Sequence, residues 1–151
     1  MAVAAGDTLP DFDLATSGGG RLRASDLRGK RTVLYFYPKD DTTGCTTEAR
    51  EFTAALPQFA KQGVQVVGVS PDSEKSHDRF VAKCSIGFPL ISDPDRALCE
   101  AFGVWVSKSM YGRTYMGVER STFLVGADGR VERAWRKVKA SGHAKEVLGA
   151  L

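Results

Sequence analysis

Short apolar runs alternate with stretches of helical spacing through most of the chain. Runs that are apolar on both faces, typical of buried strands, occupy residues 32–37, 64–70 and 88–91. After each run, apolar residues recur every three or four positions, which predicts helices at 45–63, 73–84 and 94–102. Pro57 is expected to kink or divide the first helix, and Asp93 with Pro94 to start the third. This order predicts parallel strands joined by crossover helices.

The two ends of the chain follow a different pattern. A glycine cluster at 18–20 separates short strand-like segments and predicts an N-terminal hairpin. Strands at 121–125 and 131–135, joined through Asp128-Gly129, predict a second hairpin, and a helix over 143–151 closes the chain. Residues 104–118 are expected to be irregular. The sequence therefore predicts a single α/β domain, residues 1–151, with a thioredoxin-like fold: a mixed central sheet flanked by helices.

Composition excludes several classes of protein. With 42% hydrophobic and 26% charged residues in 151, the chain fits neither a disordered protein nor a membrane protein. A net charge of +3 is too small to indicate nucleic-acid binding. The N-terminal residues lack the basic segment of a secretory signal. Three cysteines without a C-x-x-C pair argue against a disulfide-stapled secreted protein and favour a cytoplasmic enzyme with a reactive thiol.

The segment YFYPKDDTTGCTTEA contains the candidate site. It delivers Cys45 from a buried strand, through a polar loop, to the first turn of a helix, where free backbone N–H groups favour a thiolate. Thr42 brings a hydroxyl near the sulfur, and Pro38 shields one side of the pocket without an N–H. A thiolate alone does not make a fast enzyme, so the pocket also needs a donor for the transition state. Arg120, just before the strand at 121–125, is the candidate.

The motif P-x-x-x-T-x-x-C, formed by Pro38, Thr42 and Cys45, resembles the active-site motif of the peroxiredoxins. With SDPDRALCEAFGVW and VERSTFLVGADG, the chain is similar to the bacterioferritin comigratory protein (PrxQ) subfamily from about Gly6 onwards. This resemblance implies a thioredoxin fold and reduction of hydrogen peroxide and organic hydroperoxides, with thiol recycling and no metal or organic cofactor. It implies that Cys45 is the peroxidatic cysteine, that Thr42 orients the peroxide, and that Arg120 and Pro38 complete the pocket.

The resolving thiol is less well defined by the resemblance. Many relatives carry it five positions after the peroxidatic cysteine, where this chain has Arg50. Other relatives carry it in the following helix, which implies a role for Cys84. The same residue also fits the apolar face of that helix, and Cys99 fits a core position. A thioredoxin-like reductant and a monomeric enzyme are expected. A one-cysteine peroxidase, a thioredoxin-type disulfide oxidoreductase and a non-catalytic redox sensor remain alternatives.

Two histidines and two segments lie outside the motifs described above. His77 and His143 have neither triad nor metal-ligand spacing and are expected at the surface. The basic run 130–139 is interpreted as a solvated edge strand. The aromatic segment 105–116 is interpreted either as a lining of the substrate mouth or reductant dock, or as a plain surface loop.

Overall fold

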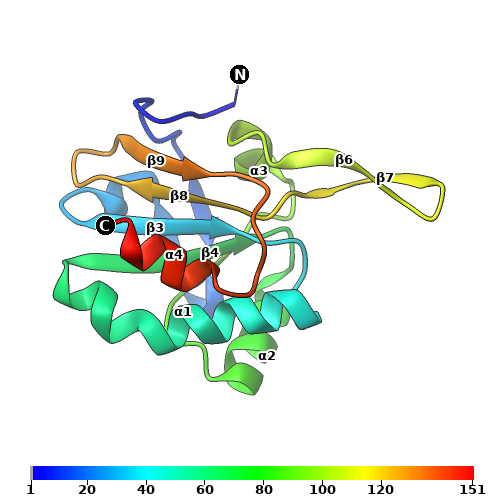
Figure 1. Cartoon of the computed structure of the whole chain (residues 1–151), viewed down its shortest axis with the longest axis horizontal. Helices are drawn as coiled ribbons and strands as arrows, with labels where there is room; N and C mark the ends of the chain where they lie inside the picture. Colours follow the sequence, from blue (N-terminus) through cyan, green and yellow to red (C-terminus); the bar gives the residue numbers. More distant parts are fainter. Residues whose placement is uncertain (1) are drawn as a thin grey trace.

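A five-stranded mixed sheet forms the centre of the structure, a computed structural model that describes residues 2–151 (Figure 1). The central strand β3 pairs in parallel with β4 and antiparallel with β8. The predicted thioredoxin-like mixed sheet is therefore confirmed. In spatial order its strands are β5 (Leu90–Ser92), β4 (Val64–Ser70), β3 (Arg31–Phe36), β8 (Ser121–Val125) and β9 (Val131–Trp135).

Helices cover both faces of this sheet, because β3 is apolar on both sides. Val33 and Tyr35 face the core beneath α1 (Thr43–Lys61) and α4 (His143–Gly149), which lie on the same face of the sheet (Figure 1). Leu34 and Phe36 belong to a second core on the opposite face, with residues of α3 and of the N-terminal segment. Burial of each large apolar side chain contributes about 1.5–3 kcal/mol. The two cores together fix the position of the end of β3, where the candidate site begins.

Helix α1 is continuous from Thr43 to Lys61, so the expectation that Pro57 divides it is wrong. Proline removes one helical N–H and crowds the preceding turn, but it does not oblige a helix to end. Phe52 and Phe59, on either side of the proline, are fully buried and hold the helix against the sheet. Packing thus outweighs the local cost of the proline.

Helix α2 (Glu74–Cys84) follows β4 and was predicted with nearly its observed bounds. The side chain of Ser73 accepts a hydrogen bond from the backbone N–H of Ser76, 3.2 Å away, and so caps the N-terminus of the helix. Phe80 and Cys84 on one side of α2 join the core that lies under α1. The helix ends at Ser85, which adopts a left-handed conformation.

Two hairpins stand outside the central sheet. The N-terminal one, predicted from its glycines, pairs β1 (Asp13–Ala15) with β2 (Arg21–Arg23). A short 3-10 turn at Ser17–Gly19 connects the two strands, and another at Ala24–Leu27 follows them. The other contradicts the expectation of an irregular segment at 104–118. It pairs β6 (Trp105–Met110) with β7 (Arg113–Val118) and projects from the body as an arm (Figure 1).

Helix α3 (Ala97–Ala101) is shorter than the predicted 94–102. Arg96, in a left-handed conformation, precedes it, and the Asp93 carboxylate accepts hydrogen bonds from the backbone N–H groups of Leu98 and Cys99. Asp93 therefore does stabilise the N-terminus of the helix, but from a point further outside it than predicted. Within residues 2–151, no helix combines the length and the apolar character that crossing a bilayer requires.

Candidate functional site

The site begins at the point where β3 delivers the chain to α1. The backbone N–H of Tyr37 continues the pairing with β4 by donating to the carbonyl of Val69, and the loop 38–42 then turns away. Helix α1 starts when the N–H of Thr46 bonds to the carbonyl of Thr42. Cys45 is thereby placed in the first turn of α1, as predicted. Its side chain is only 2% exposed.

Arg120 reaches this sulfur from just before β8, the strand that pairs with β3 on the side away from β4. Ser121 pairs with Phe36, so the residue before β8 lies beside the loop that follows β3. From there the guanidinium donates from Nη2 to Sγ of Cys45 over 3.4 Å, which brings a positive charge into contact with the sulfur. Gly44 permits this approach, since a Cβ at that position would lie 3.1 Å from Nη2.

Glu48 completes the pocket and was not singled out from the sequence. Its Oε1 accepts a 2.6 Å bond from Nη1 of Arg120, and its side chain is fully buried. Burial raises the pKa of Glu48 to about 7, and Arg120 opposes that rise. The signal in the sequence was its spacing: Glu48 lies three residues after Cys45, and therefore on the same side of the helix.

The electrostatics of Arg120 follow from these two partners. Burial disfavours its charge, but Glu48 and the Cys45 sulfur outweigh burial, so its pKa is raised. The neighbouring Tyr35 is also buried, and its pKa is raised by burial first and by Glu48 second. Across residues 2–151, the only buried side-chain oxygens or nitrogens without a hydrogen-bond partner are Tyr35 Oη and Glu48 Oε2. The pocket therefore combines the Arg120 cation with two buried oxygen atoms that lack a hydrogen-bond partner.

Pro38 and Thr42 occupy the loop as predicted. Pro38 and Arg120 line the same cavity of about 470 Å³, to which the β6–β7 arm contributes Lys108 and Tyr115. Of the two interpretations of the aromatic segment, this contact favours a lining of the mouth. The hydroxyl of Thr42 donates to the carbonyl of Lys39, 2.9 Å away, and makes no capping bond to α1.

The other two cysteines differ from Cys45 in their surroundings. Cys84 is the last residue of α2, is 9% exposed and belongs to the same core as Cys45. Cys99 is fully buried in the other core, and burial, followed by the Asp93 charge, raises its pKa. All three thiols are free. The expectation that Cys99 is a core residue is confirmed.

Both histidines are buried, which contradicts the expectation of surface positions. His143 bonds through Nδ1 to Glu146 and through Nε2 to the hydroxyl of Thr122, and burial lowers its pKa. His77 shares the face of α2 that carries Phe80, and this helical spacing was the signal for its burial.

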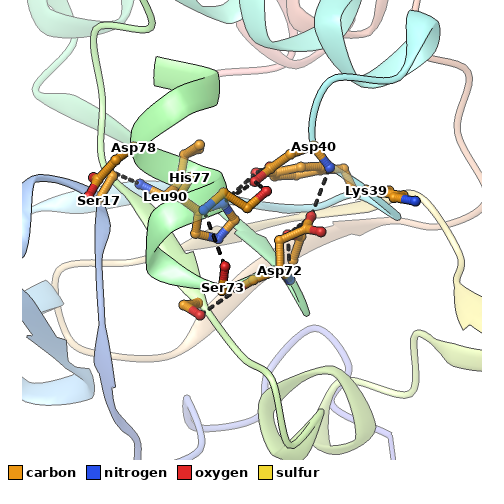
Figure 2. A network of polar contacts seen from close by, with 12 residues as sticks. Ser17, Lys39, Asp40, Asp72, Ser73, His77, Asp78 and Leu90 are labelled. Carbon is orange, nitrogen blue, oxygen red and sulfur yellow. Dashed lines mark hydrogen bonds and ion pairs between the residues drawn. The ribbon is translucent and has the colours of Figure 1, made fainter. Parts of the chain in front are cut away.

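His77, Asp40 and Asp72 bring ligand atoms within 4.8 Å of one another, an arrangement that suits a metal ion (Figure 2). Their atoms are already hydrogen-bonded within the protein, however. Asp72 Oδ2 accepts from the N–H of Asp40 and from the Ser70 hydroxyl, while both ring nitrogens of His77 face oxygen atoms. We therefore assign the cluster to holding the loop rather than to a metal.

Comparisons with known proteins identify the family of this chain. Residues 5–134 match the AhpC/TSA family. Peroxiredoxin Bcp of Xanthomonas campestris pv. campestris is 54% identical over 93% of this chain and 88% of its own. A Cys-to-Ser mutant of Xylella fastidiosa PrxQ superposes with a TM-score of 0.94 at 48% identity, covering 99% of this chain and 96% of its own.

A further solved relative bears on the chemistry. The bacterioferritin comigratory protein of Xanthomonas campestris, for which an alkyl peroxide reduction activity is described, superposes with a TM-score of 0.89 at 50% identity. The match covers 95% of this chain and 96% of the other. With its thiol at a helix start and its arginine against the sulfur, the chain therefore belongs to the AhpC/TSA family, among the peroxiredoxins of the Bcp (PrxQ) type.

Proposed function

We propose that this chain is a thiol peroxidase in which Cys45 reduces hydrogen peroxide and organic hydroperoxides. The observation that carries the proposal is the 3.4 Å bond from Arg120 Nη2 to Cys45 Sγ. The thiolate sulfur attacks the terminal oxygen of the hydroperoxide, and the O–O bond breaks. The sulfur becomes a sulfenic acid, while the leaving oxygen takes a proton and departs as water or an alcohol.

The pocket residues have distinct roles in this step. Arg120 holds the thiolate and stabilises the negative charge that develops on the peroxide oxygens. Glu48 fixes the guanidinium through the 2.6 Å bond, so the donor is oriented before the substrate arrives. Because the Thr42 hydroxyl already donates its hydrogen bond to the carbonyl of Lys39, its oxygen can act only as an acceptor for the peroxide O–H. Pro38 limits water at the cavity wall.

Cys84 is the proposed resolving thiol. Its sulfur attacks the sulfenic acid of Cys45, the S–O bond breaks, and water leaves as the disulfide forms. A disulfide requires Cα atoms within about 7 Å, and both cysteines now lie in helices. We therefore expect the first turn of α1 and part of α2 to unwind during the cycle. Unchanged hydrogen exchange in both segments on oxidation would contradict this step.

A dithiol protein of the thioredoxin type is the proposed reductant: its two thiols give two electrons and two protons to the disulfide and become a disulfide themselves, while Cys45 and Cys84 return to thiols. Resolution within one chain needs no second subunit, so we propose a monomer. The odd number of cysteines, which argues against a disulfide-stapled secreted protein, supports a site of action in the reducing cytoplasm.

The experiment that tests the proposal compares Cys84→Ser with the wild-type protein. The variant is expected to consume one equivalent of hydrogen peroxide as fast as the wild type, then to stop, while the wild type turns over with thioredoxin. Mass-spectrometric mapping after one equivalent of peroxide is expected to find a disulfide between Cys45 and Cys84. Size-exclusion chromatography of the oxidised protein checks that the bridge lies within one chain.

Other outcomes would point to other functions. Normal turnover by Cys84→Ser would indicate a one-cysteine peroxidase or resolution by Cys99. A single oxidation without turnover in the wild type, whatever the reductant, would indicate a redox sensor. Reduction of insulin disulfides would indicate a disulfide oxidoreductase, for which the sequence offers no C-x-x-C motif.

A further inference from the structure

The loop between β3 and α1 is bound to α2 by a buried carboxylate, Asp40. Its Oδ1 accepts a 2.6 Å bond from the hydroxyl of Tyr37. Its Oδ2 accepts a 2.8 Å bond from the hydroxyl of Ser76 and lies 2.7 Å from Nδ1 of His77 (Figure 2). Asp40 is 6% exposed and His77 is fully buried. Three donors thus converge on one carboxylate, two of them from the first turn of α2.

His77 extends this contact to the sheet. Its Nε2 lies 2.9 Å from the carbonyl oxygen of Ile91 in β5. Both ring nitrogens thus face oxygen atoms, one of Asp40 and one of Ile91. The imidazole therefore joins three elements at one point: the loop that precedes Cys45, helix α2 and the edge strand β5.

A second contact joins the same loop to the other end of α2. Nζ of Lys83, in the last turn, lies 2.9 Å from both carboxylate oxygens of Asp41. The pair is exposed, unlike the pair formed by Asp40 and His77. Asp41 has a φ of 59°, a left-handed conformation that few non-glycine residues adopt. Lys83 immediately precedes Cys84, so this contact meets the helix where the proposed resolving thiol lies.

We propose that Asp40 and Asp41 act as a clasp that holds α2 against the loop preceding Cys45 and so controls how readily Cys84 reaches the oxidised sulfur. The inference rests on the proposed resolving role of Cys84. While the clasp is closed, the Cys45 sulfenic acid stays in its pocket. There a second hydroperoxide can oxidise it to sulfinic acid and leave as an alcohol or water. When the clasp opens, the disulfide forms instead.

Two isosteres of His77 separate the clasp from ordinary core packing. In His77→Asn the amide nitrogen takes the place of Nδ1, so the bond to Asp40 is kept and the bond to Ile91 is lost. In His77→Gln the amide nitrogen takes the place of Nε2, and the losses are reversed. Both variants replace the same buried ring and lose one hydrogen bond, so each is the matched control of the other.

The two measurements are deuterium uptake of the reduced protein and the ratio of disulfide to sulfinic acid at increasing peroxide. We expect His77→Gln to exchange about tenfold faster than His77→Asn at residues 39–46 and 80–84, the effect of one lost bond to a charged group. The disulfide-to-sulfinic ratio is expected to rise by a similar factor. Equal exchange and equal ratios in the two variants would overturn the clasp and indicate a purely structural histidine.

A milder pair of variants applies if His77→Gln fails to fold, as judged by circular dichroism. Lys83→Gln removes the exposed contact to Asp41, and Lys75→Gln removes another exposed lysine of the same helix as its control. We expect about a twofold higher disulfide-to-sulfinic ratio for Lys83→Gln, the effect of a surface ion pair. Identical ratios for the two lysine variants would then overturn the proposal.

The measurements also separate this inference from the proposed function. If peptide mapping finds no disulfide between Cys45 and Cys84, the resolving role fails, and the clasp can no longer control resolution. If that disulfide forms but the matched variants behave alike, the peroxidase proposal stands and the clasp alone is refuted.

Discussion

Cys45 and Cys99 lie in the two cores on opposite faces of the sheet, and both are almost completely buried. The guanidinium of Arg120 donates to the sulfur of Cys45, whereas the carboxylate of Asp93 accepts from the backbone N–H of Cys99. Burial and the Asp93 charge both raise the pKa of Cys99. The two thiols are thus buried alike but differ in the charge beside them: a cation contacts the sulfur of Cys45, and an anion lies next to Cys99.

Removing each sulfur in turn gives the largest expected contrast. Cys45→Ser is expected to abolish peroxide consumption, because no other thiol of this chain lies against a guanidinium. Cys99→Ser is expected to keep the wild-type rate and to change only thermal stability. Stopped-flow measurement of peroxide loss checks both. Measurable consumption by Cys45→Ser, or a strong loss in Cys99→Ser, would contradict the comparison.

Removing the cation from the Cys45 pocket is expected to have the next largest effect. Arg120→Met takes away a preorganised donor, and the second-order rate constant with peroxide is expected to fall by about 10²–10³. Arg120→Lys keeps the charge but cannot contact both Cys45 and Glu48 as the guanidinium does. Its rate constant is therefore expected to lie between those of the wild type and Arg120→Met. A rate for Arg120→Met within a factor of two of the wild type would mean that the charge is not what distinguishes Cys45.

Glu48, beside Cys45, makes the stability of the protein depend on pH. The pKa of Glu48 is raised from 4.5 to about 7, so the folded protein favours the protonated carboxyl. Its contribution to the free energy of unfolding is fully present below pH 4.5 and is lost as the pH rises through 7. Glu48→Gln is expected to remove that pH dependence, at most about 3 kcal/mol. Urea unfolding of both proteins at pH 5 and pH 8 measures it; parallel changes would refute the expectation.

The smallest expected effect concerns the approach of the guanidinium to the sulfur. Gly44→Ala places a methyl group 3.1 Å from Arg120 Nη2, so the guanidinium must shift by a few tenths of an ångström. We expect the rate with peroxide to fall severalfold, about as much as a modest misalignment costs. Gly149→Ala in α4, where a methyl group meets open space, is the control and is expected to leave the rate unchanged. Equal rates for the two variants would contradict the expected misalignment.

The sequence predicted the parts of the site that depend on local spacing. Pro38, Thr42 and Cys45 lie within eight positions. The strand end, the loop and the helix start that the sequence predicts therefore place all three near one another. Arg120 lies 75 residues from Cys45, and no spacing rule joins two residues across an antiparallel pair of strands. It was identified by resemblance and by its place beside a strand, and the register between β3 and β8 explains why it arrives at the sulfur.

Other features were missed for identifiable physical reasons. His77 was expected at the surface because the residues near it in the sequence have neither triad nor metal-ligand spacing. Its partners in the structure, Asp40 and Ile91, come from other elements. The β6–β7 arm was expected to be irregular because a two-stranded ribbon with largely exposed residues shows little apolar alternation. Its turn uses Tyr111 and Gly112, both at positive φ, in place of the usual Asn-Gly.

The long separation between the thiol and its arginine has a consequence during synthesis. β3 and β4 come from the first half of the chain, but the strand that brings Arg120 into place emerges only when four fifths of the protein has been made. A nascent chain on the ribosome thus carries its cysteine without the guanidinium that contacts the sulfur in the folded structure. If Arg120 acts as proposed, sensitivity to oxidant is expected only after β8 has paired with β3.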